Sequence, residues 1–520
     1  MEKTNNLKTT TEPHTDDKPP TETLSNLTIN TNNTNSKLIN LNTTTASINS
    51  NNQNKGSNLI EIPTISQSDP NSEEVKEMLK GVKEVRVAVI GNVDSGKSTL
   101  VGVLTKCVLD DGRGAARQLI FNYDHEKENG RTSSIAQEIM GFKSNDQIEP
   151  AKTTDKKNTS WTKILKESDK VISIIDLCGH EKYLKTTIFG LTGLVPDYAM
   201  IIIGANMGVQ RMTKEHLGIA LALKIPIYVV ITKIDIAPPD IYKQTLEYIT
   251  KVLKSTGTQK LPVVVREQDD VCVYAESILF DRICPIFCIS NVTGEGVKQL
   301  RNFMSMLMSR TGQQLNSTFK SSSDKVEFLM DGAFSVKGVG LVVSGTLIAG
   351  KVSVGTNLML GPDAKGDFKQ VAVKSIHYKR TPCDEIASGN SCCFQIKSKD
   401  NIKQSDLRKG MVLLDKESNY KPVYEFEAEV IILHHATTIK PKYQAVIHCG
   451  VVRQTAQVVS MTCDLLRTGD RGIVRFKFMK APEYLHVGAT ILFREGRTRG
   501  VGNIKNLIYP EKEKEKEKGK

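Results

Sequence analysis

The sequence has little of what would mark a membrane, secreted or cysteine-ligated metal protein. Its 520 residues contain no apolar run of the roughly 18 residues needed to span a bilayer, and no charged start followed by an apolar stretch. Its ten cysteines form no C-x-x-C pair, and most lie in apolar, strand-like runs. We therefore expect a cytoplasmic chain with reduced core thiols and no contact with a membrane.

Both ends of the sequence lack the apolar residues that a folded core needs. Residues 1–75 are dominated by Asn, Thr and Ser and have almost no aromatic side chains, which predicts a disordered tail. Residues 509–520 are mostly alternating Glu and Lys, which predicts a solvated charged tail. The remaining length is enough for roughly three domains.

Between the tails the sequence pattern changes once. From 76 to 312, short apolar runs alternate with amphipathic stretches, which is typical of a mostly parallel sheet flanked by helices. The clearest predicted strands are 85–90, 171–175, 198–203, 227–231 and 285–289, and the clearest helices are 214–223 and 299–308. After a polar linker near 316–324, β-rich runs separated by Gly, Pro, Asp and Asn predict two β-barrels, 325–420 and 421–508.

The most informative motif follows the first predicted strand. Gly91–Thr99 reads GNVDSGKST and fits G-x-x-x-x-G-K-[ST] between a strand and a helix. Gly91 and Gly96 let backbone N–H groups point inward at an anion, and the helix N-terminus adds positive charge. Lys97 is expected to reach the β- and γ-phosphates, and Ser98 to hold Mg²⁺. The other predicted nucleotide-binding residues of this phosphate loop are Asn92, Val93, Asp94, Ser95 and Thr99.

A second motif ends the predicted strand 171–175. Asp176 stands at the carboxyl end of that strand, where a carboxylate can hold Mg²⁺ beside the phosphates. Gly179 has no side chain to keep its amide from a γ-phosphate. A lone histidine is more often structural than catalytic, but His180, directly after this glycine, is predicted to orient the attacking water.

Two strings after the next strands indicate guanine as the base. In TKID, the Asp235 carboxylate can accept hydrogen bonds from the N1 and N2 donors of guanine, which adenine lacks. Ser290, after the last strand, can support this loop and present backbone amides to the guanine O6 atom. Either string alone fits an ordinary turn, and their order along the sheet favours the base site. The predicted base-site residues are Thr232, Lys233, Asp235, Ser290, Asn291 and Val292.

In this order, the motifs GxVDxGKST, DxxGH and TKxD resemble the GTPase domain of elongation factor Tu and elongation factor 1-alpha. Phe334–Gly355 resembles the first β-barrel of those factors. LDDGRGAARQ (Leu109–Gln118) and GRTSSI (Gly130–Ile135) are similar to the subfamily of GTP-binding protein 1 and GTP-binding protein 2. The resemblance implies a P-loop GTPase domain over 76–312 that binds GTP or GDP with Mg²⁺ and hydrolyses GTP.

The sequence departs from the elongation factors at two places that matter. Thr232 replaces the usual Asn of the guanine motif, which removes an amide that helps to brace the loop. The elongation factors carry R-G-I-T-I, whose Thr completes the Mg²⁺ shell, where this switch segment reads RTSSI (Arg131–Ile135). Either Thr132 or Ser134 must then supply the hydroxyl, and alignment of the flanking residues favours Ser134.

The resemblance also implies a molecular switch. GTP and Mg²⁺ would order the switch segment, and hydrolysis would release it and reorient the barrels. His180 would swing towards the γ-phosphate when a large ribonucleoprotein docks, with Val93 holding it back otherwise. The implied partners are aminoacyl-tRNA or the ribosome and, in a quality-control role, RNA-decay or quality-control factors. The chain is expected to be a monomer.

The net charge leaves other functions open. The formal charge of +12 lies mostly in the C-terminal half and fits either a polyanion partner or an ordinary solvated surface. One alternative is an RNA-binding adaptor whose hydrolysis is too slow to matter, which the altered switch segment favours. The other is a GTPase subunit of a metabolic enzyme, which would share the three-domain layout. Stimulation by ribosomes tests the first, and co-purification of RNA tests the second.

Overall fold

The computed structural model describes residues 83–150, 158–310, 325–400, 402–418, 421–496 and 498–509. The predicted linker near 316–324 and the two predicted tails, apart from residue 509, lie outside these ranges. No helix within the described ranges is both long and apolar enough to cross a membrane.

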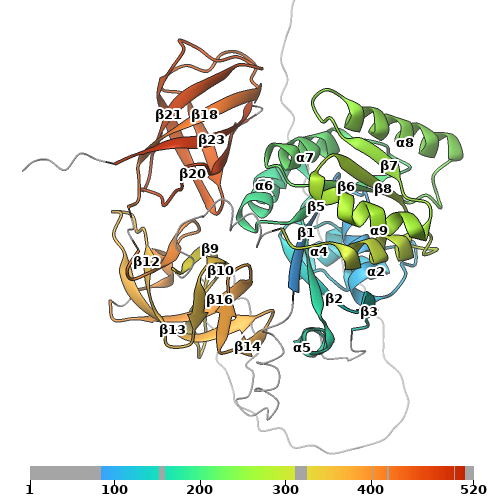
Figure 1. The fold of residues 1–520 in the computed structure, drawn as a ribbon, viewed down its shortest axis with the longest axis horizontal. Coiled ribbons are helices and arrows are strands. Elements are labelled where there is room, and N and C mark those ends of the chain that lie inside the picture. The colour runs from blue at the N-terminus through green and yellow to red at the C-terminus, as the bar shows by residue number, and fades with distance from the viewer. Residues whose placement is uncertain are drawn as a thin grey trace, which may run out of the picture. The chain divides into compact units, whose positions relative to one another are not determined.

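An eight-stranded mixed sheet forms the first folded region. Its strands are β1 (Lys83–Gly91), β2 (Ala136–Lys143), β3 (Asp146–Ile148), β4 (Lys170–Asp176), β5 (Tyr198–Gly204), β6 (Ile227–Thr232), β7 (Leu261–Val264) and β8 (Ile283–Cys288). They lie in the order β3-β2-β4-β1-β5-β6-β8-β7 (Figure 1). The strands from β4 to β7 in this order are parallel to one another, while β2 and β3 form an antiparallel edge. Each predicted strand is present.

Helices cover both faces of this sheet. They are α2 (Lys97–Lys106), α3 (Ala115–Gln118), α4 (Asp124–Asn129), α5 (Asn158–Glu167), α6 (Leu184–Gly193), α7 (Arg211–Ala222), α8 (Pro239–Lys254), α9 (Gln268–Ser277) and α10 (Val297–Met306), with the short 3-10 turns η1 (Glu181–Tyr183) and η2 (Ile278–Phe280). A third 3-10 turn, η3 (Gln404–Asp406), lies in the β-rich part of the chain. The two predicted helices correspond to α7, which begins at Arg211, and to α10.

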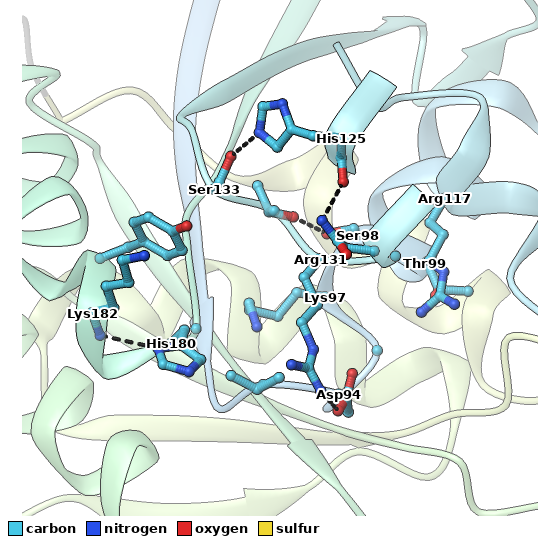
Figure 2. A pocket seen from close by; sticks show the side chains of 17 residues that line it. Asp94, Lys97, Ser98, Thr99, Arg117, His125, Arg131, Ser133, His180 and Lys182 are labelled. Carbon is cyan, nitrogen blue, oxygen red and sulfur yellow. Dashed lines mark hydrogen bonds and ion pairs between the residues drawn. The ribbon is translucent and has the colours of Figure 1, made fainter. Parts of the chain in front are cut away.

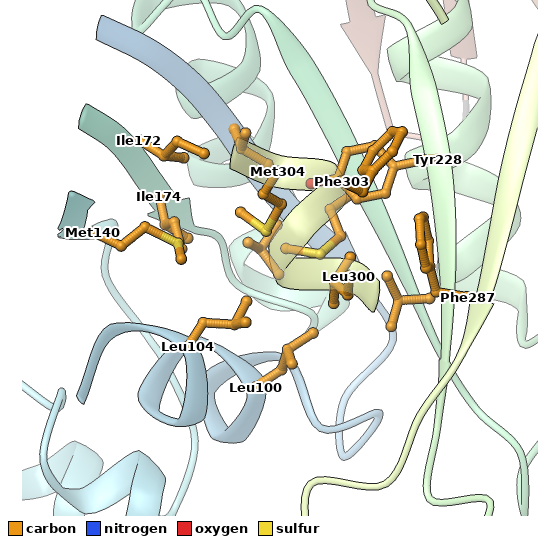
Figure 3. Packing of buried hydrophobic residues seen from close by; sticks show 14 of the residues in the cluster. Leu100, Leu104, Met140, Ile172, Ile174, Tyr228, Phe287, Leu300, Phe303 and Met304 are labelled. Carbon is orange, nitrogen blue, oxygen red and sulfur yellow. The ribbon is translucent and has the colours of Figure 1, made fainter. Parts of the chain in front are cut away.

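Alternate residues of β1 enter two separate cores because successive side chains of a strand point to opposite faces. Val87 and Val89 pack in one apolar cluster with residues of α2 and α10, and Ala88 and Ile90 pack in another with residues of α6 and α7. Figure 3 shows the first cluster, in which leucines of α2 face α10. The ring of Phe303 lies 5.2 Å from that of Tyr228 and 5.0 Å from that of Phe287, measured between centroids. Both faces of the central strand are therefore anchored, and the loop that follows β1 starts from a rigid base.

Two closed β-barrels follow. The first is built by β9 (Glu327–Val336), β10 (Gly340–Ala349), β12 (Asn357–Gly361), β13 (Lys369–Tyr378), β16 (Ser391–Ser398) and β17 (Val412–Asp415), with the short strands β11 (Lys351–Ser353), β14 (Thr381–Cys383) and β15 (Glu385–Ala387). The second is built by β18 (Glu425–His434), β19 (Gln444–Cys449), β20 (Val452–Met461), β21 (Arg471–Phe478), β22 (Thr490–Glu495) and β23 (Thr498–Ile508).

Strand pairing closes each barrel. In the first, the order β12-β17-β9-β10-β16-β13 returns to its start because β12 also pairs with β13. In the second, the order β18-β21-β20-β19-β22-β23 closes through β23 and β18. Buried and accessible residues alternate along β18, as a strand with one face in a barrel core requires. The predicted class, an α/β domain followed by two β-barrels, is confirmed.

Candidate nucleotide site

The predicted motifs meet at one edge of the sheet. The strands β1, β4, β6 and β8 are parallel, so the loops at their carboxyl ends lie on the same side. The strand register pairs Val89 with Asp176, which brings the carboxylate to the point where the phosphate loop begins. Beside them is a cavity of about 330 Å³, lined by the phosphate loop, the start of the switch segment and the turn that contains His180 (Figure 2).

The phosphate loop depends on its glycines. Gly91 and Gly96 have φ values of 153° and 83°. A Cβ atom on Gly91 would lie 2.3 Å from the carbonyl oxygen of Ile202, so the loop can turn closely over β5 only with glycine here. Gly96 directly precedes α2, so the helix N-terminus faces the cavity. The loop therefore has the geometry of an anion cradle.

Lys97 is held inside this loop. Its side chain is buried, and its Nζ donates to the carbonyl oxygen of Asn92 at 2.6 Å. Burial lowers the pKa of Lys97, while the charge of Asp176 acts to raise it. The Ser95 hydroxyl donates to the same Asn92 carbonyl at 2.9 Å. The ammonium group is thus fixed against the phosphate loop, where it lines the cavity.

A buried histidine braces the loop from behind. His216 of α7 is fully buried, and its Nδ1 accepts a hydrogen bond from the Gly91 amide at 3.2 Å. Burial lowers the pKa of His216 to about 3, so the ring is neutral and Nδ1 can accept. The sequence pattern did not single out His216, because a histidine on the apolar face of a helix resembles any core residue.

Three oxygen-bearing side chains gather on one side of the cavity. The Ser98 hydroxyl donates to Asp176 Oδ2 at 2.6 Å, and the Thr132 hydroxyl lies 2.7 Å from Ser98 Oγ and 3.3 Å from Asp176 Oδ2. Asp176 Oδ1 is buried and has no hydrogen-bond partner among the described residues. Burial raises the pKa of Asp176 to about 6, and this effect outweighs the lowering by the Ser98 hydrogen bond and by the charge of Lys97. A carboxylate and two hydroxyls are hard oxygen donors, so this cluster fits Mg²⁺.

The switch segment corrects one expectation. Ser134 does not lie with Ser98 and Asp176. Its amide and hydroxyl donate instead to Glu126 Oε1 at 3.1 and 2.9 Å, and those of Ser133 donate to the same oxygen at 2.8 and 2.9 Å. The flanking residues favoured Ser134 as the metal-side hydroxyl, but the arrangement places Thr132 there.

Glu126 itself is a residue that the motifs did not indicate. Its side chain lies in α4 and is 1% exposed. Burial acts to raise the pKa of Glu126, but the hydrogen bonds from Ser133 and Ser134 outweigh it, and the pKa lies below its ordinary value. Because one oxygen receives four hydrogen bonds, Glu126 is the main contact that fixes the serine pair.

Gly179 and His180 border the cavity from β4. A Cβ atom on Gly179 would lie 2.5 Å from Lys97 Nζ and 2.7 Å from the carbonyl carbon of Asn92, so this close approach also requires glycine. His180 is exposed, and its Nδ1 accepts from the Lys182 amide at 3.0 Å, which caps η1. Val93 and His180 line the same cavity.

The base-side loops lie outside the cavity lining but are tied to the phosphate loop. Thr232 is fully buried, and its hydroxyl donates to the Ser95 carbonyl oxygen at 2.8 Å. The replacement of Asn by Thr was expected to remove a brace, but this hydroxyl supplies one. Lys233 Nζ donates to the Asp94 carbonyl oxygen at 2.8 Å. The Asp235 side chain, three residues after Thr232, is exposed.

The loop after β8 is ordered by its own serine. The Ser290 hydroxyl accepts from the amides of Val292 and Thr293 at 3.2 and 3.1 Å, as expected of a side chain that supports this turn. The Asn291 carbonyl oxygen accepts from the Asp110 amide at 2.9 Å, and Asn291 Oδ1 is buried without a partner among the described residues. The turn is therefore rigid before any base is considered.

Comparison with known proteins agrees with these motifs. Residues 83–310 match the family described as "Elongation factor Tu GTP binding domain". The chain is 50% identical over 425 residues to GTP-binding protein 1 of Xenopus laevis, and 42% identical over 426 residues to GTP-binding protein 2 of Homo sapiens. Each match covers 82% of this chain, and 64% and 69% of the respective relative. The chain belongs to the GTP-binding protein 1 and 2 family of elongation factor Tu-like GTPases.

The fold of this family member also has a solved counterpart. Translation elongation factor SelB from Methanococcus maripaludis, in complex with the GTP analogue GppNHp, has a TM-score of 0.56 and 20% identity to it. The match covers 82% of this chain and 80% of that one. At this identity the likeness concerns the fold, which is an α/β domain with β-barrels. The family resemblance expected from the sequence is confirmed.

Proposed function

We propose that the chain is a Mg²⁺-dependent switch that binds GTP and GDP and hydrolyses GTP. The observation that carries this proposal is the cluster of Ser98, Thr132 and Asp176 beside the buried Lys97. Asp176 Oδ1 is buried without a protein partner, and the pKa of this carboxyl is raised. Both features are expected of a carboxylate that binds a cation. Family membership supports the same chemistry.

Each residue then has a defined task. Lys97 and the backbone amides of the phosphate loop bind the β- and γ-phosphates, while Ser98, Thr132 and Asp176 hold Mg²⁺, directly or through water. The bound metal supplies positive charge that stabilises the charge developing on the phosphate oxygens. The Gly179 amide faces the γ-phosphate.

His180 orients the attacking water in this proposal. Its Nδ1 caps η1 through the Lys182 amide, and this hydrogen bond holds the ring in its orientation. Because the ring is exposed, a docked partner can reposition it directly. This makes turnover slow without the partner and fast with it.

The base is recognised at the second pair of loops. The Asp235 carboxylate accepts from the guanine N1 and N2 donors, and the turn supported by Ser290 presents its amides to O6. Thr232 keeps the base loop in register with the phosphate loop. A site that leaves a carboxylate unpaired with adenine discriminates strongly against it.

We infer an RNA-containing partner, either aminoacyl-tRNA or the ribosome. The support is the formal charge of +12, the two β-barrels after the nucleotide domain, and relatives named elongation factor 1-alpha and SelB. We further propose a role in translation or in quality control of mRNA, in the cytoplasm and as a monomer. The domain limits that we propose are 76–312, 325–420 and 421–508.

One specific observation favours a second candidate, the RNA-binding adaptor with negligible hydrolysis. The serines of the switch segment are held by a protein carboxylate, Glu126, through four hydrogen bonds. Such a segment can stay ordered whichever nucleotide is bound, which would weaken the switch.

GTP turnover with and without ribosomes separates the two candidates. The wild-type chain, His180→Ala and the control Lys185→Ala, an exposed position on α6, are compared. The switch predicts stimulation by ribosomes that falls about 100-fold or more in His180→Ala and not in the control. Equal, unstimulated turnover in all three proteins would favour the adaptor.

A further inference from the structure

The motif LDDGRGAARQ places at the nucleotide cavity an arginine that has no role in the proposed function. Arg117 lies in the short helix α3 and lines the cavity together with Lys97 and Ser98. Figure 2 shows Arg117 beside Thr99, on the other side of Lys97 from His180. The guanidinium therefore borders the phosphate site at the end away from the proposed attacking water.

Arg117 differs from Lys97 and Arg131, two other cations that line the cavity, because its guanidinium is unpaired. Lys97 donates to the Asn92 carbonyl oxygen, and Arg131 lies 3.5 Å from the Asp94 carboxylate. Within the described ranges of the chain, no group forms a hydrogen bond or ion pair with the guanidinium of Arg117, and its Nε atom is buried. The part of this guanidinium that lines the cavity meets no protein acceptor, so it suits an anionic oxygen.

The surroundings of Arg117 are shaped for a flat side chain. A Cβ atom on Gly114 would lie 2.4 Å from Arg117 Nε, and one on Gly130 would lie 3.0 Å from Arg117 Nη2. Both glycines have positive φ values, 99° and 63°. Two separate backbone turns thus leave room for the guanidinium, and Gly130 directly precedes the switch segment.

We propose that Arg117 binds the α- or β-phosphate of the nucleotide as a second fixed cation beside Lys97. The inference rests on the proposed function and names one more ligand contact of that site. His180 and Gly179 mark the γ-phosphate side, and Arg117 lies on the opposite side of Lys97. A contact to the α- or β-phosphate exists with both GTP and GDP, so Arg117 contributes to affinity for both. Its planar fork can hold two phosphate oxygens at once, which a lysine cannot.

Calorimetric titration of the full chain with GDP and with GTP, each with Mg²⁺, tests this assignment. The variants are Arg117→Gln, Arg117→Lys and the matched control Arg113→Gln, an exposed arginine in the same motif that does not line the cavity. We expect Arg117→Gln to weaken both nucleotides by about tenfold or more, Arg117→Lys to weaken both less, and the control to bind as the wild type does.

Two results would overturn the assignment. The first is a folded Arg117→Gln that binds GDP and GTP as tightly as the wild type. The second is a loss of affinity for GTP with unchanged affinity for GDP, which would place Arg117 at the γ-phosphate. If Arg117→Gln does not fold, Arg117→Lys decides, because unchanged affinity for both nucleotides contradicts a bidentate contact. A wild-type chain that binds no guanine nucleotide would contradict the proposed function itself, which is a different failure.

Discussion

The phosphate loop and the switch segment border the same cavity but are held in different ways. The loop is fixed by its backbone, through glycines in conformations that other residues rarely adopt, and by buried contacts from Thr232 and His216. The switch segment is fixed by side chains, chiefly the single carboxylate of Glu126. The loop is therefore a permanent binding surface, while the switch segment can exchange one set of hydrogen bonds for another. Variants of the loop should affect GTP and GDP alike, and variants of the switch segment should affect GTP more.

The largest expected effect concerns the base loops, which are tied to the phosphate loop. Asp235→Asn replaces an acceptor with a group that can also donate, so guanine loses its partner while xanthine gains one. We expect affinity for GDP to fall about 100-fold and affinity for xanthosine diphosphate to rise, in competition assays with both nucleotides. Asp240→Asn, in the first turn of α8, is the control. Unchanged preference for guanine would remove Asp235 from the base site.

Removal of the Thr132 hydroxyl tests most directly whether the switch segment acts separately from the phosphate loop. Thr132→Val keeps the shape of the side chain and removes the hydroxyl beside Ser98 and Asp176, whereas Ser134→Ala removes a donor to Glu126. We expect Thr132→Val to raise the Mg²⁺ concentration needed for tight GTP binding about tenfold and to change GDP binding little. The same titration should move less in Ser134→Ala, and the opposite ranking would restore Ser134 as the metal-side residue.

The pH dependence of Mg²⁺ binding tests the role of Asp176, which ends β4 beside the phosphate loop. The folded pKa of this carboxyl is raised to about 6, so it binds a proton between about pH 4 and pH 6 while the unfolded chain does not. Its contribution to the stability of the metal-free protein therefore falls as pH rises through this window. The metal needs the ionised form, so affinity for Mg²⁺ in the presence of GDP should fall about tenfold per pH unit below pH 6. A flat profile between pH 5 and pH 7 would contradict the raised pKa.

The smallest expected effect comes from Glu126, which holds the switch serines. Glu126→Gln keeps an oxygen that can accept from Ser133 and Ser134 but removes the charge, while Glu126→Ala removes the acceptor. Stopped-flow release of a fluorescent GTP analogue should be a few times faster in Glu126→Ala and close to wild type in Glu126→Gln. Release of the GDP analogue should change little in both. Equal acceleration for GTP and GDP would show that the switch segment is not separable from the loop.

The sequence predicted the loop much better than the switch segment, for a physical reason. Positions such as Gly91 and Gly179 allow only glycine because backbone atoms would meet a Cβ, so a short motif already carries their geometry. The order of the motifs along the sequence then predicted the position of Asp176 and the mostly parallel arrangement of the sheet. Contacts between distant side chains leave no such signal. His216 binds the amide of a residue 125 positions away, and Glu126, which no motif marked, accepts hydrogen bonds from Ser134.

Thr232 shows the same limit of sequence-based prediction, because here a contact is present where its loss is expected. From the residue type alone, the missing Asn amide is expected to leave the base loop without a brace. In the folded chain the shorter hydroxyl reaches the Ser95 carbonyl oxygen at 2.8 Å and performs the bracing. Residue type alone therefore did not show whether the two loops were joined.

Calorimetry of the wild-type chain against Lys97→Met, with GDP and GTP in excess Mg²⁺, tests the central claim most directly. Methionine retains the length and apolar stem of the buried side chain and removes its charge, and Lys254→Met, exposed at the end of α8, controls for the change of residue type. The account predicts saturable binding of both nucleotides to the wild type and to Lys254→Met, and a loss of about 100-fold or more in Lys97→Met. No measurable binding to the wild type, or equal binding by all three proteins, would contradict it.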